Sequence, residues 1–389
     1  MTQGPAIALI AGEESGDALG AALMRALRER SRVHFIGVGG HQMSAQGLAS
    51  PFPIDDLAII GFAAIPRRLP HILRRIREAA ERVVAARPVA LVIIDSPEFT
   101  HRVARRVRAA APDIPIIDYV SPTVWAWRPG RARAMRGYVD HVLALLPFEP
   151  QAHARLSGPP CTYVGHPLLD RLTELRPDVV EAARRRTAPP LLLVLPGSRS
   201  GEIARHLATF GEALAVLASG QSPLEVVLPT LPYLAGRIAA ATAAWPTRPR
   251  IVVDVEEKLA AFRGARAALA KSGTVTLELA LAGVPMVTAY KVSFIEEIVG
   301  RLAIHAPSAI LPNLILAQNV VPEFLQRDCT ASNLAHALAP LLADGPARQA
   351  QLDAFTRLDE VMRLDASGPA SPSARAAELV LRLTKSTLS

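Results

Sequence analysis

The segment from Leu191 to His206, LLLVLPGSRSGEIARH, holds residue types that could bind a diphosphate. Its apolar run is typical of a buried parallel strand, and a helical pattern begins directly after the turn. In that turn Gly197 lets backbone N–H groups approach a ligand, and the helix start contributes partial positive charge. Ser198 is followed by Arg199, whose planar guanidinium suits phosphate oxygens. We therefore predict a diphosphate site at Gly197, Ser198 and Arg199, with an ordinary strand-to-helix turn as the alternative.

A second turn of this kind lies at Ser272, Gly273 and Thr274, within the sequence KSGTVTLE. Gly273 frees backbone N–H groups, and the two flanking hydroxyls could contact a phosphate. Glu278, one helical turn later, could accept both hydroxyls of a ribose, or it could be an ordinary exposed helix acid. Two such turns in one half of the chain indicate a nucleoside diphosphate. The sequence has no GxxxxGK[ST] and no Asp-x-Asp, which disfavours a P-loop NTPase and a transferase that holds its diphosphate through a metal.

Asp95 ends VALVIID, the most apolar strand predicted in the first half of the chain. Ligands of parallel sheets bind beyond the carboxyl ends of the strands, so a carboxylate here is a candidate general base. Capping of the following helix is the alternative. Ser15 lies in the turn AGEESGD between the first strand and the first helix. That turn either contacts a ligand or only caps the helix through Ser15 or Asp17.

Two of the three tryptophans lie in YVSPTVWAW, from Tyr119 to Trp127. Aromatic faces suit sugar rings or acyl chains, and core packing is the alternative. The glycines between Gly37 and Gly40 lack the spacing of a dinucleotide fingerprint, which makes an NAD-binding domain a weak interpretation.

The segment from residue 59 to residue 87 predicts a basic amphipathic helix with an apolar lead-in. Apolar residues recur at helical spacing, and arginines form a dense cationic face. Such a helix can bind an anionic membrane surface; a core helix with a solvated arginine face is the alternative, and spacing alone favours it slightly. The residues expected to contact a membrane or acyl chains are Ile59, Ile60, Phe62, Ile65, Leu69, Ile72, Leu73, Arg67, Arg68, Arg74 and Arg75.

These candidate sites lie among short apolar runs that alternate with helical patterns, which predicts an α/β fold with parallel sheets. The expected strands are 7–11, 34–38, 89–95, 114–120, 142–146, 162–164, 191–195, 225–228, 251–253, 267–270 and 285–289. Between residues 171 and 190 the alternation lapses into charged helix and proline-rich linker. We therefore predict two Rossmann-like domains, residues 1–175 and 188–346, that face each other across a cleft containing the active site. Residues 347–389 are expected to form a helical segment that packs back toward the first domain.

The chain of 389 residues is half hydrophobic and carries a net charge of +8. This charge favours an acidic partner such as nucleic acid, anionic lipid or a phosphorylated substrate, although the arginine-rich composition of a GC-rich genome explains much of it. The two cysteines have no metal-ligand spacing and fit a reducing cytoplasm. No apolar run reaches the length of a membrane span, and the N-terminal residues predict a first strand rather than a signal peptide.

Taken together, these segments resemble the lipid-A-disaccharide synthases, a family of bacterial glycosyltransferases with the GT-B architecture. The resemblance extends over nearly the whole chain, and so many motifs in one order make it highly specific. The motifs that carry it are AGEESGD (Ala11 to Asp17), GVGGHQM (Gly37 to Met43), IDSPEF (Ile94 to Phe99), YVSPTVWAW (Tyr119 to Trp127), LPFEP (Leu146 to Pro150), YVGHPLLD (Tyr163 to Asp170), LPGSRSGEI (Leu195 to Ile203), KSGTVTLELALAGVPMV (Lys271 to Val287) and LPNLI (Leu311 to Ile315).

The resemblance implies an inverting transfer of 2,3-diacylglucosamine from UDP-2,3-diacylglucosamine to the 6-hydroxyl of 2,3-diacylglucosamine 1-phosphate, with no metal or other cofactor. It implies that Asp95 is the catalytic base, that Ser15 serves catalysis or acceptor binding, and that Arg199 contacts the UDP diphosphate. The other expected contacts with UDP or the donor are Gly197, Ser198, Ser272, Gly273, Thr274, Glu278, Gln318 and Asn319. The chain departs from the family pattern at His41, where Pro is usual, and at Thr100, where Asn is common. The second departure leaves the position of the acceptor near Thr100 open.

Because both substrates carry acyl chains, the resemblance favours the membrane-surface interpretation of residues 59–87 and a peripheral location on the cytoplasmic face of the inner membrane. It implies no nucleic-acid partner, and a homodimer is compatible with the sequence. The nearest alternative is another UDP-sugar enzyme of the same layout, such as a lipid-linked N-acetylglucosaminyltransferase or a UDP-sugar epimerase. A non-catalytic nucleotide- or lipid-binding protein is the alternative from a different class.

Overall fold

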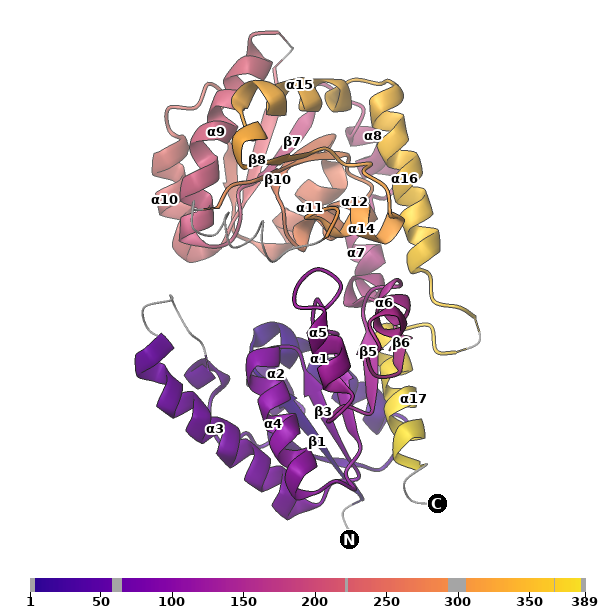
Figure 1. Cartoon of the computed structure of the whole chain (residues 1–389). Helices are drawn as coiled ribbons and strands as arrows, with labels where there is room; N and C mark the ends of the chain where they lie inside the picture. Colours follow the sequence, from indigo (N-terminus) through magenta and orange to yellow (C-terminus); the bar gives the residue numbers. More distant parts are fainter. Residues whose placement is uncertain (1–3, 58–64, 221–222, 293–305, 367, 386–389) are drawn as a thin grey trace. The chain divides into compact units, whose positions relative to one another are not determined.

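The structure is a computed structural model that describes residues 4–57, 65–220, 223–292, 306–366 and 368–385. It divides the chain into two compact units, which are described separately (Figure 1). Unit 1 comprises Met1–Asp170 and Leu364–Ser389, and unit 2 comprises Arg171–Arg363.

Unit 1 is built on a six-stranded parallel sheet in the order β2-β1-β3-β4-β5-β6. Its central strands are continuous apolar runs because helices cover both faces of the sheet. The strands are β1 (Ala6–Ala11), β2 (His34–Val38), β3 (Ala90–Ile94), β4 (Ile116–Tyr119), β5 (His141–Ala144) and β6 (Cys161–Tyr163). The helices are α1 (Glu14–Arg28), α2 (His41–Ala45), α3 (Ile65–Ala86), α4 (Pro97–Ala110), α5 (Gly130–Met135), α6 (Glu149–Arg155) and α17 (Pro372–Lys385), with 3-10 turns at η1 (Ile54–Leu57) and η3 (Pro167–Arg171).

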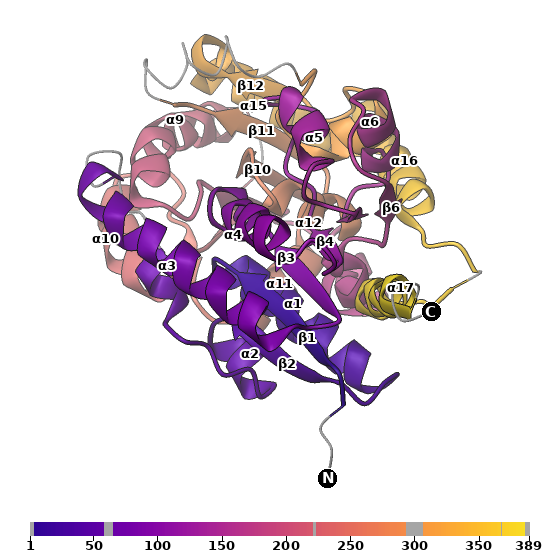
Figure 2. The ribbon, with the colours of Figure 1, turned by 60° about the horizontal axis from the view of Figure 1, so that its bottom comes forward.

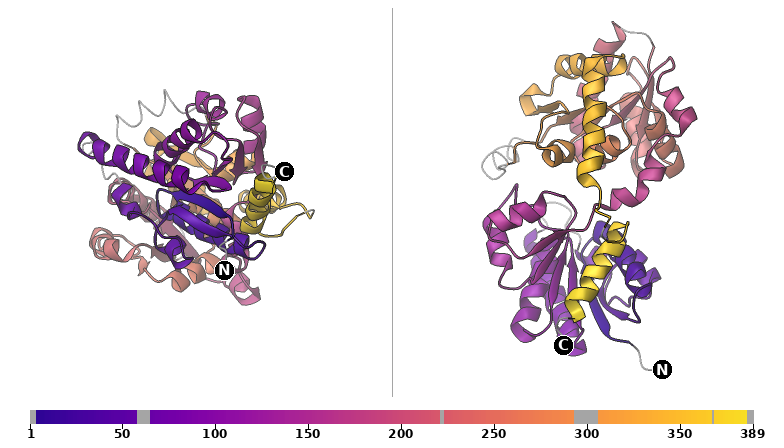
Figure 3. Two further views of the ribbon diagram at one scale, coloured as in Figure 1. Left: turned by 90° about the horizontal axis from the view of Figure 1, so that it is seen from below. Right: turned by 90° about the vertical axis from the view of Figure 1, so that its right-hand side faces the viewer.

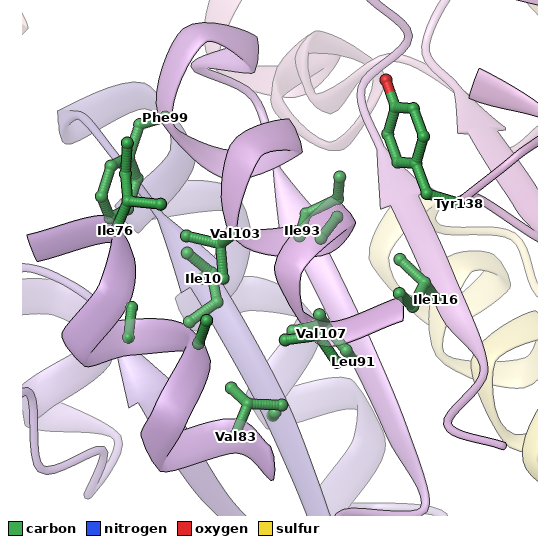
Figure 4. Packing of buried hydrophobic residues seen from close by; sticks show 14 of the residues in the cluster. Ile10, Ile76, Val83, Leu91, Ile93, Phe99, Val103, Val107, Ile116 and Tyr138 are labelled. Carbon is green, nitrogen blue, oxygen red and sulfur yellow. The ribbon is translucent and has the colours of Figure 1, made fainter. Parts of the chain in front are cut away.

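Different helices cover the two faces of this sheet. On one face α3 and α4 lie side by side against the central strands (Figure 2). The core beneath them, shown in Figure 4, includes Ile10, Ile76, Val83, Leu91, Ile93, Val103 and Val107. On the other face α1 packs against α17, and both contribute buried apolar side chains such as Leu23 and Val380. The sheet is therefore sealed on both sides, which leaves the ends of its strands as the places where polar side chains can act.

Unit 2 repeats the architecture with a second six-stranded parallel sheet in the order β12-β11-β10-β7-β8-β9. Its strands are β7 (Leu191–Leu195), β8 (Glu225–Pro229), β9 (Arg250–Val252), β10 (Ala267–Lys271), β11 (Met286–Tyr290) and β12 (Glu323–Leu325). Its helices are α7 (Leu172–Leu175), α8 (Val179–Arg184), α9 (Ser200–Ala218), α10 (Pro232–Thr242), α11 (Val255–Gly264), α12 (Val275–Leu281), α14 (Leu311–Leu316), α15 (Ala331–Leu342) and α16 (Pro346–Met362), with a 3-10 turn at η4 (Gln326–Asp328). The apolar faces of α9 and α15 form the core on one side of the sheet.

The last two helices belong to different units. α16 packs against α12, α14 and α15 in unit 2, whereas α17 packs against α1 in unit 1 (Figure 3). Residues 347–389, predicted as one helical segment, therefore divide between Arg363 and Leu364. Within residues 171–190, predicted as charged helix and proline-rich linker, the structure has α7 and α8, which belong to unit 2.

The predicted α/β class with two parallel sheets is confirmed. The predicted strands occur in the predicted order, and the structure adds β12, a three-residue edge strand that is too short to show a hydrophobic period. In the described part of the chain, no helix combines the length and the apolar character that crossing a membrane requires.

Candidate active site

Asp95 lies directly after β3, and its carboxylate is fixed by two hydrogen bonds. The Ser15 hydroxyl donates to Oδ2 over 3.0 Å, and the backbone N–H of Ser96 donates to Oδ1 over 2.8 Å. Asp95 is half-buried and Ser15 is exposed. A carboxylate oxygen has two lone pairs, so each oxygen can accept one further hydrogen bond, for example from a substrate hydroxyl. The structure thus brings together the two residues predicted for catalysis in unit 1.

The backbone at Asp95 adopts a conformation that residues other than glycine rarely adopt. Asp95 has φ of +53° and Ser96 has φ of +44°, both in the left-handed region. Two such residues in succession persist only where neighbouring groups hold them, and they are concentrated at functional sites. Thr100 supplies part of that support, because its buried hydroxyl lies 2.6 Å from the carbonyl oxygen of Asp95 and donates to it. The hydrogen bond from Thr100 therefore stabilises the backbone conformation of Asp95.

The predicted helix-capping alternatives for the AGEESGD turn are both wrong. α1 begins at Glu14, with Glu13 at its N-cap and no side-chain cap. The buried carboxylate of Asp17 instead accepts hydrogen bonds from the backbone N–H groups of Gly40, Gln42 and Met43 at the start of α2. Asp17 therefore ties the GVGGHQM loop to α1, and Ser15 remains available to Asp95.

In the aromatic segment that runs from the end of β4 toward α5, one aromatic side chain is buried and two are partly exposed. Tyr119 is buried in the core, while Trp125 and Trp127 are half-buried. The indole N–H of Trp125 donates to Glu149 over 3.2 Å, and Glu149 also accepts from the backbone N–H of Leu146. Burial raises the pKa of Glu149 to about 7. The segment is thus anchored by a carboxyl group with an unusually high affinity for a proton.

Unit 2 contains a cavity of about 500 Å³ at the carboxyl ends of its central strands. The lining includes Gly197, Ser198 and Arg199 after β7 and Gly273, Thr274 and Glu278 after β10. Both predicted phosphate turns therefore open into one cavity. Gly197 has φ of +116°, a backbone conformation that favours glycine, and a Cβ there would lie 2.7 Å from Oε2 of Glu202. The cavity has the size and the N–H-rich turns that a nucleoside diphosphate needs.

Charged side chains meet in pairs along this cavity. Lys258 Nζ donates to Glu278 Oε2 over 3.3 Å, and Lys271 Nζ donates to Glu202 Oε1 over 3.2 Å. Arg199 is 84% exposed and reaches the same oxygen of Glu202 over 3.4 Å. Burial opposes ionisation of Glu202, but Lys271 and Arg199 outweigh it and lower the pKa of this carboxyl. The cavity therefore holds the Glu202 carboxylate beside Lys271 and beside Arg199, the cation that we predict for a diphosphate.

Some predicted donor contacts do not line the cavity. Ser272 is buried behind its turn, and among the described atoms its hydroxyl oxygen has no hydrogen-bond partner. Gln318 and Asn319 are exposed after α14, where Gln318 Oε1 accepts from Arg357 on α16. Glu202, Lys258, Lys271 and Thr230 line the cavity without having been predicted from the sequence. Lys271 directly precedes the predicted SGT turn, and Glu202 lies three residues after Arg199. Their closeness in sequence to the predicted turns could have identified both residues.

The predicted membrane contacts in α3 separate into exposed and buried positions. Leu69 and Leu73 are each 41% exposed, and Arg74 is exposed beside them. Three of the predicted contacts lie outside the described residues: Ile59, Ile60 and Phe62. For three others the structure describes the helix but not the side chains: Ile65, Arg67 and Arg68.

Two of the predicted membrane contacts are corrected by the structure. Ile72 is 8% exposed and belongs to the core beneath α3, so it packs within unit 1. Arg75 donates to Glu78 over 2.9 Å and to Asp56, and its guanidinium lies 4.5 Å from the ring centre of Phe52. The charge of Arg75 is therefore balanced by carboxylates inside unit 1. Helical spacing alone does not reveal which arginine has such a partner.

Comparison with known proteins identifies relatives of the whole chain. Residues 7–371 match the model of a family described as lipid-A-disaccharide synthetase. The chain is 61% identical to the lipid-A-disaccharide synthase of Nitrobacter hamburgensis over 377 residues, which cover 96% of this chain and 94% of that protein. It is 59% identical to the enzyme of the same name from Rhodopseudomonas palustris over 375 residues, which cover 96% and 95%.

Solved structures of distant proteins share the fold. MurG of Acinetobacter baumannii has a TM-score of 0.59 at 15% identity, covering 97% of this chain and 99% of that one. The UDP-GlcNAc 2-epimerase of Neisseria meningitidis, solved with UDP-GlcNAc, has a TM-score of 0.60 at 11% identity, covering 98% and 100%. These likenesses establish two parallel-sheet units of the GT-B type. The family match and the high identities to named relatives go further: the chain belongs to the lipid-A-disaccharide synthase family.

Proposed function

We propose that this chain transfers 2,3-diacylglucosamine from UDP-2,3-diacylglucosamine to the 6-hydroxyl of 2,3-diacylglucosamine 1-phosphate. The products are the β-1,6-linked lipid A disaccharide 1-phosphate and UDP. Family membership supports the reaction class, and the cavity of unit 2 supports the nucleotide half of the assignment. The single observation that carries the catalytic half is the Asp95 carboxylate, held by Ser15 and Ser96 at the end of β3.

The donor half of the proposal rests on the two turns of unit 2. Backbone N–H groups near Gly197 and Gly273 and the guanidinium of Arg199 would bind the diphosphate. Glu278, fixed by Lys258, would accept the hydroxyls of the ribose. As the bond from the anomeric carbon to the diphosphate oxygen breaks, negative charge grows on UDP, and the same groups would stabilise it.

The acceptor half rests on Asp95. Its carboxylate would take the proton of the 6-hydroxyl while that oxygen forms the new bond to the anomeric carbon, on the face opposite to UDP. Ser15 would hold the carboxylate in position and could itself contact the acceptor. Attack from the opposite face inverts the configuration, which gives the β linkage.

We also propose that the transfer needs no metal ion and takes place on the cytoplasmic face of the inner membrane. The cationic side chains of the cavity offer the charge compensation that a diphosphate otherwise obtains from a metal. Both substrates carry acyl chains, and the exposed Leu69, Leu73 and Arg74 of α3 give an anionic lipid surface apolar and cationic contacts.

The test is an assay with both substrates in detergent, read by mass spectrometry for the disaccharide and for UDP. We expect disaccharide and UDP in equal amounts, and neither product when the acceptor is left out. Turnover of the UDP-sugar without the acceptor would instead indicate an epimerase or hydrolase. UDP binding with no turnover of either substrate would indicate a binding protein.

A further inference from the structure

One carboxylate lies where a site for a diphosphate should have none. Glu202 is in the first turn of α9, and its Oε1 faces both Lys271 Nζ at 3.2 Å and Arg199 Nη1 at 3.4 Å. The side chains of Glu202 and Lys271 are each only 16% exposed, so this pair is largely shielded from solvent. A shielded ion pair is screened weakly by salt, so it acts strongly on any charge that enters the cavity.

The geometry of the turn shows how tightly Glu202 is built into the cavity. Its Oε2 lies so close to Gly197 that a Cβ at that residue would approach it to 2.7 Å. The carboxylate therefore sits against the backbone of the turn that we assign to the diphosphate. Glu278, the other carboxylate of the lining, is held by Lys258 and has a role in binding ribose. Glu202 has no such role toward a nucleotide, because a carboxylate repels phosphate oxygens.

The charges of the cavity nearly cancel without a ligand. Among the residues that the structure describes, its lining has three cationic side chains, Arg199, Lys258 and Lys271, and two carboxylates, Glu202 and Glu278. A diphosphate adds at least two negative charges. Arg199 is 84% exposed and can turn toward it, whereas the ammonium of Lys271 already donates to Glu202, so a phosphate oxygen would compete with Glu202 for Lys271. The Lys271 ammonium also lies 5.2 Å from the ring centre of Tyr290, a cation–π contact that favours its present position.

We propose that Glu202 is an internal counter-ion that takes the place of the diphosphate in the empty cavity, and that Lys271 is a second diphosphate-binding cation that exchanges Glu202 for phosphate oxygens when the nucleotide binds. This inference rests on the proposed function, because it assumes that the cavity binds UDP. Its consequence is a limit on affinity: Glu202 keeps the cations in place before binding and then repels the bound diphosphate. Glu202 therefore promotes the release of UDP after transfer.

The experiment measures binding of UDP to the full chain by calorimetry. Glu202→Gln keeps the shape of the side chain and removes its charge, so we expect UDP to bind about tenfold more tightly. Lys271→Met should weaken UDP binding by about tenfold for the opposite reason. Uridine has no phosphate, so it should bind Glu202→Gln and the parent chain equally. Its binding is measured by nuclear magnetic resonance titration.

Two further variants separate this inference from the site assignment. Arg237→Gln removes an exposed positive charge of α10 outside the cavity lining, and it should leave UDP affinity unchanged. Arg199→Gln should weaken UDP binding if the donor site is correct. Melting temperatures show whether each variant is folded. The inference is overturned if Arg199→Gln weakens UDP binding but Glu202→Gln does not tighten it, or tightens uridine equally. Failure of the parent chain to bind UDP would overturn the proposed function as well.

Discussion

Asp95 combines a hydrogen-bonded carboxylate with a strained backbone. The left-handed conformations of Asp95 and Ser96 each cost on the order of 1–3 kcal/mol, so the turn exists only because its neighbours hold it. Thr100 is one of those neighbours, through its hydrogen bond to the Asp95 carbonyl. Thr100, one of the two residues at which this chain departs from the family pattern, therefore contacts the backbone of the residue that we propose as the general base.

Thr100→Val keeps the shape of this side chain and removes the donated hydrogen bond. We expect the free energy of unfolding to fall by about 1–2 kcal/mol, because the backbone carbonyl of Asp95 loses the hydrogen bond that the Thr100 hydroxyl donates. We expect kcat to fall by about tenfold through misplacement of Asp95, with UDP affinity unchanged. Thr356→Val is the matched control, because Thr356 makes the same type of bond to Leu352 on an exposed face of α16. Equal kcat in the two variants would contradict a positioning role for Thr100.

Among the elements, the loop that contains Trp125 and Trp127 is held by Glu149 at the start of α6. Burial is the largest influence on this carboxyl and raises its pKa to about 7, although the N–H groups of Leu146 and Trp125 favour the ionised form. The protonated form is thus favoured in the folded chain at a pH where the unfolded chain is already ionised. The stability that this difference contributes is complete below pH 4.5 and is lost as the pH rises to about 7.

Glu149→Gln should remove this pH dependence, because the amide is neutral at every pH. The variant should gain melting temperature relative to the parent chain as the pH rises from 5 to 8, corresponding to at most about 3 kcal/mol. The measurement is the difference in melting temperature between the two chains across that range. A constant difference would show that Glu149 ionises normally.

α3 presents an exposed surface made of Leu69, Leu73, Arg74 and Arg77. If this surface binds the membrane, replacing both leucines with Gln should weaken binding to vesicles containing anionic lipid by about tenfold. The matched control replaces Val179 and Val180 of α8, which are 87% and 77% exposed, with Gln. Sedimentation with vesicles measures both double variants. Equal loss in the two would contradict a specific role for α3.

How much of this site the sequence could predict depends on the range of the interactions. The turns after β7 and β10 were predictable, because each lies within one short segment with a glycine at the point of closest approach. Asp95 was predictable from its position at the end of an apolar strand. The partners of Asp17, Arg75 and Glu202 were not, because those contacts join residues far apart in sequence or depend on side-chain geometry.

The same limit applies to the elements. Strands such as β2 and β7 occur with the predicted bounds, because five apolar or alternating residues suffice to identify a strand. The division of the C-terminal segment was not predicted: both helices have one apolar face, and α17 packs in unit 1 whereas α16 packs in unit 2.

At the scale of the whole molecule, each unit carries a different part of the proposed reaction. In the proposed reaction unit 1 would supply the general base and unit 2 the cavity for the nucleotide, so both units would have to act on the same pair of substrates. Charge on the departing UDP would be balanced by side chains and backbone N–H groups of unit 2 alone.

Removal of divalent cations tests this assignment of charge balance. We expect the transfer rate to stay within twofold when EDTA is added to protein that has been dialysed against chelator. An enzyme without added chelator, assayed with and without Mg²⁺, is the control. A rate that falls with EDTA and returns with Mg²⁺ would mean that a metal ion carries part of the diphosphate charge.

The central claim is that Asp95 activates the acceptor hydroxyl while a separate cavity holds UDP. The most direct measurement compares Asp95→Asn with the parent chain in both the transfer assay and UDP calorimetry. We expect the transfer rate to fall by about 10²- to 10⁴-fold with UDP affinity unchanged, because Asn keeps the shape of the side chain but cannot accept the proton. A transfer rate close to that of the parent chain, or loss of UDP binding together with activity, would contradict the account.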